Sequence, residues 1–545
     1  MEEENRQVTV ETHPITVVPG LHRIFVDYCG GELAKKAETA GWYAAAPTDS
    51  GWQNAEQGHT AGHRAGLAEI LAAQNPGAGA ALDELRAGAN VVVTGQQVGI
   101  LGGPLFTPNK AATAIALAKE ATAAGRAHLP VFWLASEDHD FEEVNHVTFP
   151  ARRELRKLTY GATPKAAVPV GGVVLDESIT PLIDQAWELL GYSDAMEGLA
   201  AAYRPGNTLA GAFAEFYSKV FAQHGLLILD AQGREAHRLG APVLAAAIER
   251  ADELHAALLE RNRELQSAGY HSQVAVAEHG SLLFLIDSQT GARNALKRTA
   301  ASAREPGGLW QAGREKYSTA ELLGILASQP QRISPSALLR PVFQDQILPT
   351  SAYIGGPAEI AYFAQSAVLY ERILGRLTPV LPRLSTTLVE PAIAKLLDRH
   401  ELSFETILAS TEESLAQRLA ARAMPVAGKR LLASAGNAVD AELTALTAYM
   451  AELDEGLGRS AGVSASKMRY QMNRLRRMAA NFELQKEASL TRHAQAVTQA
   501  LHPEGGLQER LIGAAYYLAR YGSGLVDELV REGGDGCPGH KLIRL

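Results

Sequence analysis

The densest group of ionisable side chains in the sequence falls between positions 136 and 146, where eleven residues contain five carboxylates and two histidines. Carboxylates this close raise one another's pKa, so some of them can hold a proton near neutral pH. A histidine among carboxylates can take a proton from an amine or orient a substrate. We therefore predict catalytic roles for Glu137, Asp138, His139 and Asp140. We predict substrate binding for His146, and a solvent-facing, helix-capping role for Glu142 and Glu143.

The same cluster has the residue types of a metal site, because aspartate and histidine are ligands for several divalent ions. No cysteine lies nearby, and the spacing from Asp138 to His146 matches no standard zinc site. We therefore expect no tightly bound metal. A magnesium ion carried by a nucleotide would fit this cluster more easily.

A second polar group follows a glycine-rich loop and consists of Thr94, Gly95, Gln96 and Gln97 together with Asn109 and Lys110. Such a loop, leading into a helix, presents free backbone N–H groups to an anion. The loop lacks the glycine directly before lysine that a P-loop has, and it lacks the three spaced glycines of a dinucleotide site. Gln96 and Gln97 suit sugar hydroxyls or an amide, with simple turn formation as an equal alternative. We predict substrate binding for Thr94, Gln96, Gln97, Asn109 and Lys110.

A third group comprises Tyr353, Gly355, Gly356 and Glu359, for which we also predict substrate binding. The glycines also fit a plain turn, and Glu359 in the first turn of a helix also fits a partner of the helix dipole. The Gly-x-Ser-x-Gly sequence at 458–462 follows no predicted strand, so we do not expect a serine hydrolase.

The first two groups follow two predicted strands. Val91–Thr94 and Pro130–Ala135 are short, β-branched or apolar runs typical of buried strands, and Asn109–Ala124 between them is an alanine-rich helix with Thr107 as its expected cap. A strand, a helix and a second strand in this length predict a parallel crossover unit. Ligands bind beyond the carboxyl ends of such strands, which is where both groups lie.

Further elements are expected downstream. They are a core strand at 225–230, a hairpin of Gln273–Ala277 with Leu282–Asp287 around Glu278-His279-Gly280-Ser281, a strand at 351–354, a helix at 357–374 and a return to the core at 380–383.

A heptad pattern marks the third region of the chain. Apolar residues recur at spacings of three and four in two stretches, Val439, Leu443, Leu446, Met450, Leu453 and Leu457, then Met468, Met472, Leu475, Ala479 and Phe482. A glycine-bearing segment, 458–462, separates the two stretches. The pattern predicts two helices that pair as an antiparallel coiled-coil hairpin with its turn at 458–462.

Length and composition set the broad class. At 545 residues we expect two or three folded units, and 46% hydrophobic with 20% charged residues is typical of globular proteins. A net charge of −9 gives no general attraction to nucleic acid or to an anionic membrane. The acidic N-terminus lacks a secretory signal, and no apolar run spans a bilayer. We expect a soluble, cytoplasmic protein in which neither Cys29 nor Cys537 is a nucleophile.

Together these segments resemble the bacillithiol-biosynthesis cysteine-adding enzymes. The match rests on Val93–Gln97, Gly103–Leu105 with Lys110, Pro130–Trp133 leading into Glu137–Phe141 and His146, Pro335-Ser336 with Leu339–Pro341, Gly355–Pro357 with Glu359 and Tyr362, and Leu507–Arg510. These pieces run in the family's order along nearly the whole chain, although 152–332 carries few of them. The match adds Arg340 to the expected substrate-binding residues.

The resemblance implies an α/β fold, with a Rossmann-like parallel sheet core, inserted connecting segments and an antiparallel α-helical coiled-coil domain. We expect a catalytic core at 1–390 with an inserted subdomain within about 152–332, a helical region at 391–505 with the hairpin at about 437–500, and a C-terminal segment, 506–545, that packs back on the core.

The activity implied by the resemblance joins cysteine, through its carboxyl group, to the amine of glucosaminyl-malate to give bacillithiol, in a homodimer formed through the coiled coil. A site for ATP or ADP is also implied, and similarity of the core to class I synthetases would suit an adenylate intermediate. Two alternatives stay open: a non-catalytic dimeric scaffold, and an adenylate-forming or nucleotidyl-transferase-like enzyme with another substrate. The polar cluster at a strand end counts against the scaffold.

Overall fold

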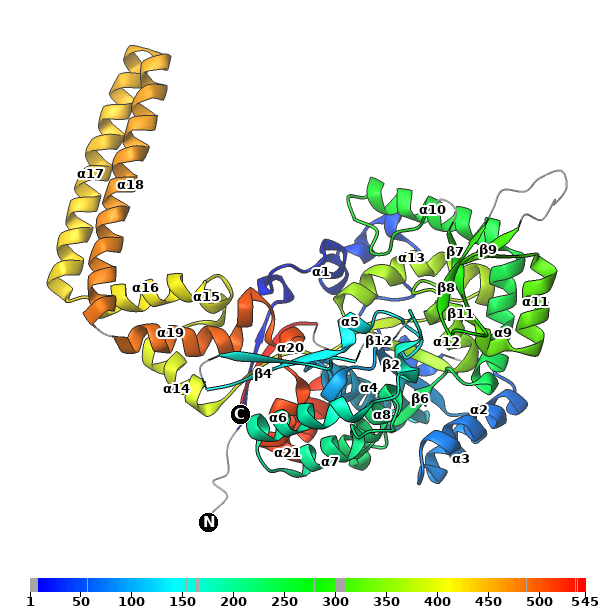
Figure 1. Cartoon of the computed structure of the whole chain (residues 1–545). Helices are drawn as coiled ribbons and strands as arrows, with labels where there is room; N and C mark the ends of the chain where they lie inside the picture. Colours follow the sequence, from blue (N-terminus) through cyan, green and yellow to red (C-terminus); the bar gives the residue numbers. More distant parts are fainter. Residues whose placement is uncertain are drawn as a thin grey trace.

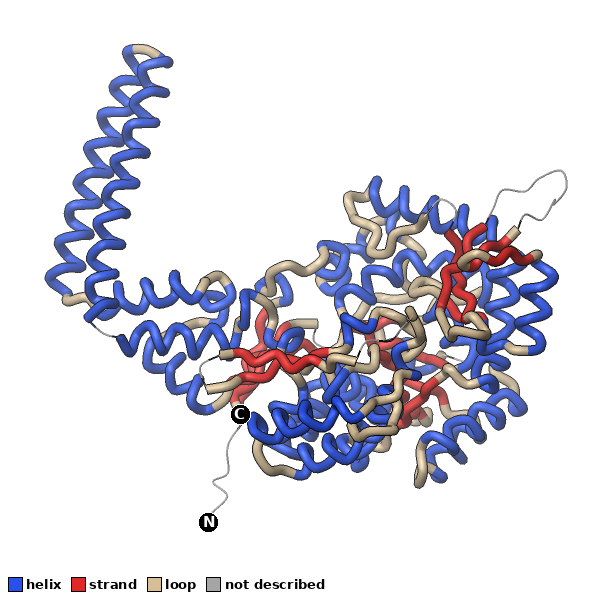
Figure 2. The backbone as a smooth tube through the Cα atoms, in the orientation of Figure 1, coloured by secondary structure: helices blue, strands red, loops and turns tan. Residues whose placement is uncertain are grey.

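The computed structural model describes residues 8–545 apart from 56, 153, 163, 165, 278–279, 299–308, 487, 535 and 537. All the strands lie in one body, and two long helices project from it (Figure 1). Figure 2 shows the strands in red as separate groups within this body, enclosed by helices. Within the described ranges, none of the helices combines the length and the apolar character needed to cross a membrane.

The central sheet has five parallel strands in the order β13-β12-β2-β3-β6. They are β2 (Asn90–Gln96), β3 (His128–Leu134), β6 (Leu227–Asp230), β12 (Thr350–Gly355) and β13 (Val380–Pro382). The helix α4 (Phe106–Ala123) connects β2 to β3, which confirms the predicted crossover unit and the α/β class. The strands predicted at 225–230, 351–354 and 380–383 correspond to β6, β12 and β13.

Helices cover both faces of the central sheet because successive side chains of a strand point to opposite faces. Val91 and Val93 pack into a core formed with α2 (Ala61–Gln74), α3 (Gly79–Ala87), α9 (Arg234–Glu249), α12 (Arg340–Ile347) and α13 (Pro357–Leu374). Phe132 and Leu134 pack into the opposite core, with α4, α8 (Leu209–Val220) and α21 (Ala514–Gly533). Burial on both faces explains the nearly unbroken apolar runs of these strands.

A second five-stranded sheet is antiparallel in every pair and has the order β10-β9-β8-β7-β11. Its strands are β7 (Gly280–Ile286), β8 (Arg293–Arg298), β9 (Trp310–Ala312), β10 (Glu315–Tyr317) and β11 (Ile333–Pro335), and α10 (Ala251–Ser267) and α11 (Thr319–Ser328) lie beside it (Figure 1). A two-stranded ribbon of β4 (His146–Pro150) and β5 (Leu155–Thr159) follows the short helix α5 (Phe141–Val144), and α6 (Thr180–Leu190) and α7 (Asp194–Ala202) come next.

Three strands from distant parts of the chain join the body to the helical region. Strand β15 (His540–Arg544) pairs with β1 (Thr9–His13) on one side and with β14 (Ser385–Val389) on the other. After β14 come α14 (Pro391–His400), α15 (Phe404–Leu408) and α16 (Glu412–Ala423), and α19 (Ala488–Leu501) packs against α14 and α16. Helix α1 (Arg23–Cys29) follows β1, and α20 (Gln508–Leu511) precedes α21.

The projecting helices are α17 (Val426–Leu453) and α18 (Glu455–Lys486), which we call the arm. They pack along one another and confirm the predicted hairpin. The predicted turn at 458–462 is wrong, because the chain reverses at Asp454 and these glycines are helical. A Cβ atom on Gly458 would lie 2.7 Å from the Cβ of Ala451, so this glycine lets the two helices approach closely. The hairpin accordingly runs from 426 to 486, and α19 is a separate helix.

Two other local predictions are wrong. Gln273–Ala277 is not a strand: β7 pairs with β8 and β11, and the amide of Gln365 in α13 hydrogen-bonds both the N–H and the carbonyl of Val274 at 2.9 Å. Glu278 and His279 of the predicted hairpin lie outside the described residues. Thr107 does not cap α4, which begins one residue earlier at Phe106 without a side-chain cap.

Candidate active site

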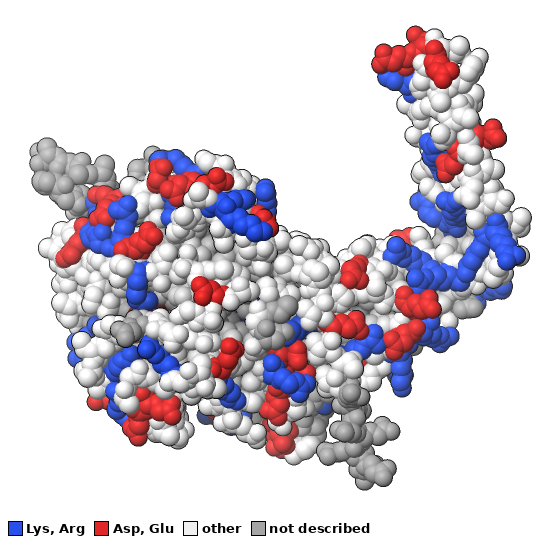
Figure 3. Space-filling view, turned by 180° about the vertical axis from the view of Figure 1, so that it is seen from behind, with Lys and Arg blue, Asp and Glu red and all other residues white. Residues whose placement is uncertain are grey.

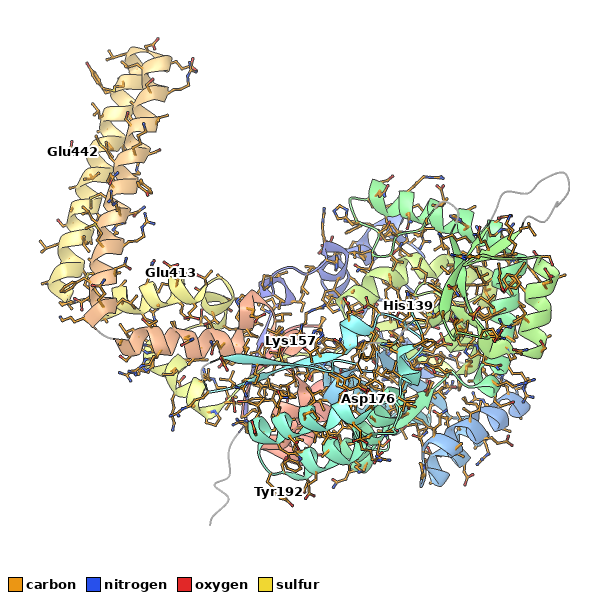
Figure 4. All side chains as sticks on the ribbon, in the orientation of Figure 1. His139, Lys157, Asp176, Tyr192, Glu413 and Glu442 are labelled. Atoms are coloured by element: carbon orange, nitrogen blue, oxygen red, sulfur yellow. The ribbon has the colours of Figure 1, made fainter. Side chains whose placement is uncertain are left out.

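The carboxyl ends of β2, β3 and β12 open onto a cavity of about 690 Å³. Gln96 and Gln97 line it at the end of β2, Glu137–His139 after β3, and Gly356–Glu359 after β12. The second sheet supplies the facing wall with Phe284 of β7 and Arg293 of β8. Figure 4 shows His139 inside the body, between the two sheets, and Glu442 out on the arm.

A buried ion pair joins two of the three predicted groups at the floor of this cavity. Lys110, in the first half of α4, pairs with Glu359 in the first turn of α13, and its Nζ also donates to the carbonyl of Gly95 at 2.7 Å and to Oε1 of Gln96 at 3.0 Å. Burial favours the neutral form of both partners, and for Glu359 the charge of Lys110 and the hydrogen bonds outweigh that effect, so the pKa of this carboxyl is lowered. Burial lowers the pKa of Lys110 despite the partner.

Two further residues of the third group hold Glu359 in place. The Tyr353 hydroxyl donates to its Oε1 at 2.5 Å, and the Gly356 N–H donates to its Oε2 at 2.8 Å. The carboxylate therefore closes the N-terminus of α13, as the helix-dipole alternative predicted, while it also lines the cavity.

Arginines form a second part of the wall. Arg340 donates to the Tyr362 hydroxyl at 2.8 Å, and both side chains line the cavity. Arg383 lines it too and makes a bidentate pair with Glu509 of α20, with N–O distances of 2.7 and 2.8 Å. Both partners are buried. Because Arg383 lies just after β13 and Glu509 lies near the C-terminus, this pair ties the C-terminal segment to the cavity.

Asp138 is the centre of a polar group on the opposite side. Its Oδ2 accepts from Gln97 Nε2 at 2.9 Å, its Oδ1 accepts from the His139 N–H at 2.8 Å, and Arg293 lies 4.0 Å from Oδ1. Partial burial raises the pKa of Asp138, but these donors and the charge of Arg293 outweigh it and lower the pKa overall. Asp138 is therefore ionised near neutral pH.

Arg293 also fixes the ring of His139. Its Nη1 lies 3.2 Å from His139 Nδ1, its Nη2 donates to the Pro335 carbonyl at 2.8 Å, and its guanidinium stacks 3.7 Å above the Phe284 ring. Arginine can only donate, so His139 accepts at Nδ1 in this arrangement. The ring proton of neutral His139 then lies on Nε2.

The carboxylate of Glu137 contacts a different element from those that its neighbours contact. Its Oε1 lies 2.8 Å from Nε2 of His237, which comes from α9 and is fully buried. The preceding residue, Ser136, donates from Oγ to Asp230 of β6 at 2.6 Å. Burial raises the pKa of Asp230, and the hydrogen bond from Ser136 offsets this increase only in part.

The cavity thus gathers residues from all three predicted groups, together with Arg340, which the family resemblance added. From the groups they are Gln96, Gln97, Lys110, Glu137, Asp138, His139, Gly356 and Glu359. The structure places six predicted residues elsewhere. Thr94 is buried within the sheet and donates to the Ile354 carbonyl, and Asn109 donates to Thr386 and Glu509. Asp140 is exposed and caps α5 through Glu143 N–H, and His146 begins β4 beside the Glu142 carbonyl. Tyr353 and Gly355 are buried beneath the wall.

For Thr94 and Asp140, local structure explains why the side chain lies outside the cavity. A strand residue such as Thr94 alternates with its neighbours, so its side chain faces the opposite layer. Asp140 starts a helix, and a short acidic side chain is favoured there regardless of function. The capping role expected for Glu142 and Glu143 belongs to Asp140 instead, while Glu143 accepts from Gln97 at 3.0 Å and lines the cavity.

Sequence patterns missed Arg293, His237, Asp230 and Arg383. Each is contributed by an element far from the motifs, and the wrong hairpin register hid Arg293 at the start of β8. Arg510 lines the cavity and belongs to the Leu507–Arg510 segment, which was noted without a role.

No group of three or more possible metal-ligating side chains occurs in the part of the chain that the structure describes. The cationic wall has the chemistry to hold an anion. The N-terminus of the eighteen-residue α13 lies between Lys110 and Arg383, and Gly356 there could not carry a side chain without crowding Glu359 at 3.3 Å. Lys110, Arg340, Arg383 and Arg510 would hold the phosphates of a nucleotide or the carboxylates of a substrate.

Parallel strands whose carboxyl ends open onto a ligand-sized cavity define a Rossmann-like protein, here with a coiled-coil domain attached. Two family models divide the chain in the same way. The N-terminal Rossmann-like domain of bacillithiol biosynthesis BshC matches residues 11–384, and the C-terminal coiled-coil domain of BshC matches residues 386–545. The chain belongs to the BshC family of bacillithiol biosynthesis.

Relatives in several bacteria match the chain over most of its length. A protein of Koribacter versatilis is 42% identical over 542 residues, covering 98% of this chain and 99% of the relative. One of Solibacter usitatus is 37% identical and covers 88% and 89%, and one of Geobacillus kaustophilus is 29% identical and covers 96% and 98%. All three bear the name "Putative cysteine ligase BshC".

Proposed function

We propose that this protein is a cysteine ligase that joins the carboxyl group of cysteine to the amine of glucosaminyl-malate and so forms bacillithiol. One observation carries the proposal: a single cavity places carboxylates that can bind an ammonium group opposite arginines and a lysine that can bind carboxylates. Family membership and the names of the relatives support the same reaction.

The two substrates match the two sides of this cavity in charge. Glucosaminyl-malate carries the carboxylates of its malate part, and Arg340, Arg383 and Arg510 offer planar, charged donors for them. Gln96 and Gln97 present amides to the sugar hydroxyls. The cationic amine then faces Glu137 and Asp138, where an ionised carboxylate attracts it.

Amide formation requires the ammonium to lose a proton before its nitrogen can attack. His139 is poorly arranged to take that proton, because its Nδ1 accepts from Arg293 and its Nε2 then carries hydrogen. A carboxylate of the Glu137–Asp138 pair takes it instead. His139 donates from Nε2 to a substrate oxygen, and Gln97 holds Asp138 in the orientation that binds the amine.

A carboxylate also requires activation before it can be attacked. A nucleoside triphosphate, when bound, supplies that activation, and an adenylate-forming route is compatible with the fold. Lys110 and Arg383 at the N-terminus of α13 would neutralise the phosphate charge.

The direct test combines the purified protein with cysteine and glucosaminyl-malate, with and without ATP, and measures bacillithiol by mass spectrometry of the labelled thiol. We expect the product to appear only with both substrates and to require the nucleotide. No product under any of these conditions would overturn the proposal. A deletion strain should correspondingly lose bacillithiol and accumulate glucosaminyl-malate.

We also propose that the arm forms a homodimer. Much of the predicted heptad seam is exposed in the single chain, including Leu446, Leu453, Leu457, Leu475 and Phe482. The contact between α17 and α18 buries Gly436, Leu443, Gly458 and Ala465 instead. Figure 3 shows long uncharged stretches on the arm. A second copy presents the same heptad-spaced apolar residues, which suits self-association. A non-catalytic dimeric scaffold, the alternative function, would have the same dimer surface.

A further inference from the structure

Glu137 and Asp138 are adjacent in sequence, but their carboxylates are bonded very differently. Both oxygens of Asp138 accept hydrogen bonds, from Gln97 and from the His139 N–H, and Arg293 adds its charge. These contacts stabilise the ionised form and make Asp138 a weak base. Glu137 accepts one hydrogen bond through Oε1, and of the described residues none hydrogen-bonds its Oε2.

The partner of Glu137 is a histidine with an unusual environment. His237 is fully buried on α9, and its ring lies 5.1 Å from that of Phe343 in α12. Its Nε2 faces Glu137, while its Nδ1 is buried without a hydrogen-bond partner among the described residues. A doubly protonated ring would bury an N–H without an acceptor, which is unfavourable. The geometry therefore favours a neutral His237 that donates from Nε2 to Glu137.

Two other charged groups act on this pair. Asp230 of β6 repels Glu137, and Arg293 of β8 attracts it. Asp230 is itself held by the hydroxyl of Ser136, the residue before Glu137. The Glu137 carboxylate is thus fixed from behind by α9 while its side chain lines the cavity.

We propose that Glu137 is the base that takes the proton from the ammonium group of the acceptor substrate, and that His237 is the positioning residue that aims Glu137. This inference rests on the proposed ligation. One N–H bond of the ammonium breaks, one O–H bond forms on the Glu137 carboxylate, and the nitrogen keeps the electron pair with which it attacks the activated carbonyl carbon. His237 keeps its own proton throughout and touches no substrate.

The test replaces His237 and measures ligation kinetics across pH. His237→Leu removes the donor, and we expect kcat to fall about tenfold to a hundredfold, as for loss of an outer partner of a reacting group, with little change in KM. Without the donor the ionised carboxylate loses its hydrogen bond, and we expect the acidic limb of the kcat/KM profile to move to higher pH. His237→Gln places an amide N–H near the position of Nε2 and should restore most of kcat and the position of the limb.

A second pair of variants covers the case in which His237→Leu does not fold. Glu137→Gln should fold, lower kcat by about a hundredfold to ten-thousandfold and remove the acidic limb. Adding His237→Ala, which removes the donor, to Glu137→Gln should then cost no further activity, because the donor acts only through the carboxylate.

The matched control is His128→Leu. His128 is also buried and contacts Ser351 at 3.1 Å, but it lies at the opposite ends of the strands from the cavity. It should lower the melting temperature and leave the pH profile unchanged. Wild-type kcat and limb in His237→Leu, or equal losses in His237→Leu and His237→Gln that follow melting temperature alone, would overturn the inference. An inactive wild-type protein would overturn the proposed function and the inference with it.

Discussion

The cavity and the arm differ in which side chains they leave without a partner inside the chain. Around the cavity two ion pairs are buried, Lys110 with Glu359 and Arg383 with Glu509. On the arm the large apolar side chains are open to solvent, with Leu453 60% and Phe482 62% exposed. A buried charge is costly unless it is paired, whereas an exposed apolar stripe is stabilised only by a partner outside.

This difference predicts that mutations in the two regions have different effects. At the cavity, Lys110 and Arg383 have their charge partners within the chain. The arm is incomplete as a structure, because most of its heptad seam faces away from its own hairpin. Perturbing the cavity should therefore change stability or catalysis in a single chain, and perturbing the arm should change association.

The largest effect is expected at the pair that joins the cavity to the C-terminal segment. Glu509→Gln leaves Arg383 buried with its charge poorly matched, and we expect the free energy of unfolding to fall by about 3–5 kcal/mol. Glu509 also accepts from Ser385 and from the Thr386 N–H, so the loss reaches β14. Urea denaturation at pH 7 measures it.

The matched control is Glu260→Gln, whose carboxylate pairs with Arg263 at the surface. We expect a change of at most about 1 kcal/mol there.

The pH dependence gives a second check on Glu509. Its folded-state pKa is lowered, chiefly by Arg383 against the effect of burial, so its contribution is present above the unfolded value of about 4.3. That contribution is lost as the pH falls from the unfolded pKa through the folded pKa. If the difference in unfolding free energy between wild type and Glu509→Gln does not shrink over this pH range, this account is contradicted.

The next effect concerns catalysis in the polar cluster. Asp138→Asn or His139→Ala should lower ligation at least about a hundredfold, equivalent to about 2.7 kcal/mol, with little change in melting temperature. Asp138 loses its charge toward the ammonium, and His139→Ala removes the Nε2 donor. Asp140→Asn is the control, because asparagine also caps a helix and Asp140 is exposed. Unchanged turnover in both site variants would mean that the cluster is only a solvated surface without a catalytic role.

The arm tests the other half of the comparison. Leu446→Asp with Met450→Asp places two charges in the heptad seam, at one exposed and one half-buried position, where burial against a second chain would be unfavourable. Sedimentation should show a monomer with an unchanged helical signal. Thr444→Asp with Ala448→Asp repeats the same spacing about half a turn away on exposed positions and should stay dimeric. A dimer that survives the first pair would place the interface elsewhere.

Local patterns predicted the elements that carry most of the cavity, for reasons visible in particular residues. Helix α13 begins at Pro357, whose ring fixes φ, and ends before Gly375, which tolerates its positive φ of 66°, so both boundaries can be predicted from residue type. The strands β2 and β3 are buried on both faces, which leaves a continuous apolar run. The polar residues after such strands then fall at one edge of the sheet.

Tertiary contacts set the rest. His237 meets Glu137 across 100 residues and Arg293 meets His139 across 154, and neither spacing leaves a periodic signal. The turn of the arm cannot be located from the sequence for a related reason. Composition favours Gly458 as a turn residue, although its role is close packing against Ala451. The heptad seam was correctly seen in the sequence, but a period alone does not say whether the partner helix belongs to the same chain.

The smallest effect is expected for the thiols. Cys29 is buried at the end of α1, and burial raises the pKa of its thiol to about 12, so it holds almost no thiolate near neutral pH. It lies outside the cavity lining, and Cys537 lies outside the described residues. The double variant Cys29→Ser, Cys537→Ser should keep ligation within about twofold of wild type while losing about 1 kcal/mol of stability from the new buried hydroxyl. Cys29→Ala is the control that removes the thiol without adding a polar group. If the double variant folds but forms no bacillithiol, a covalent step on a protein thiol must replace the direct attack of the amine, and the carboxylates of the cavity would then serve only to bind it.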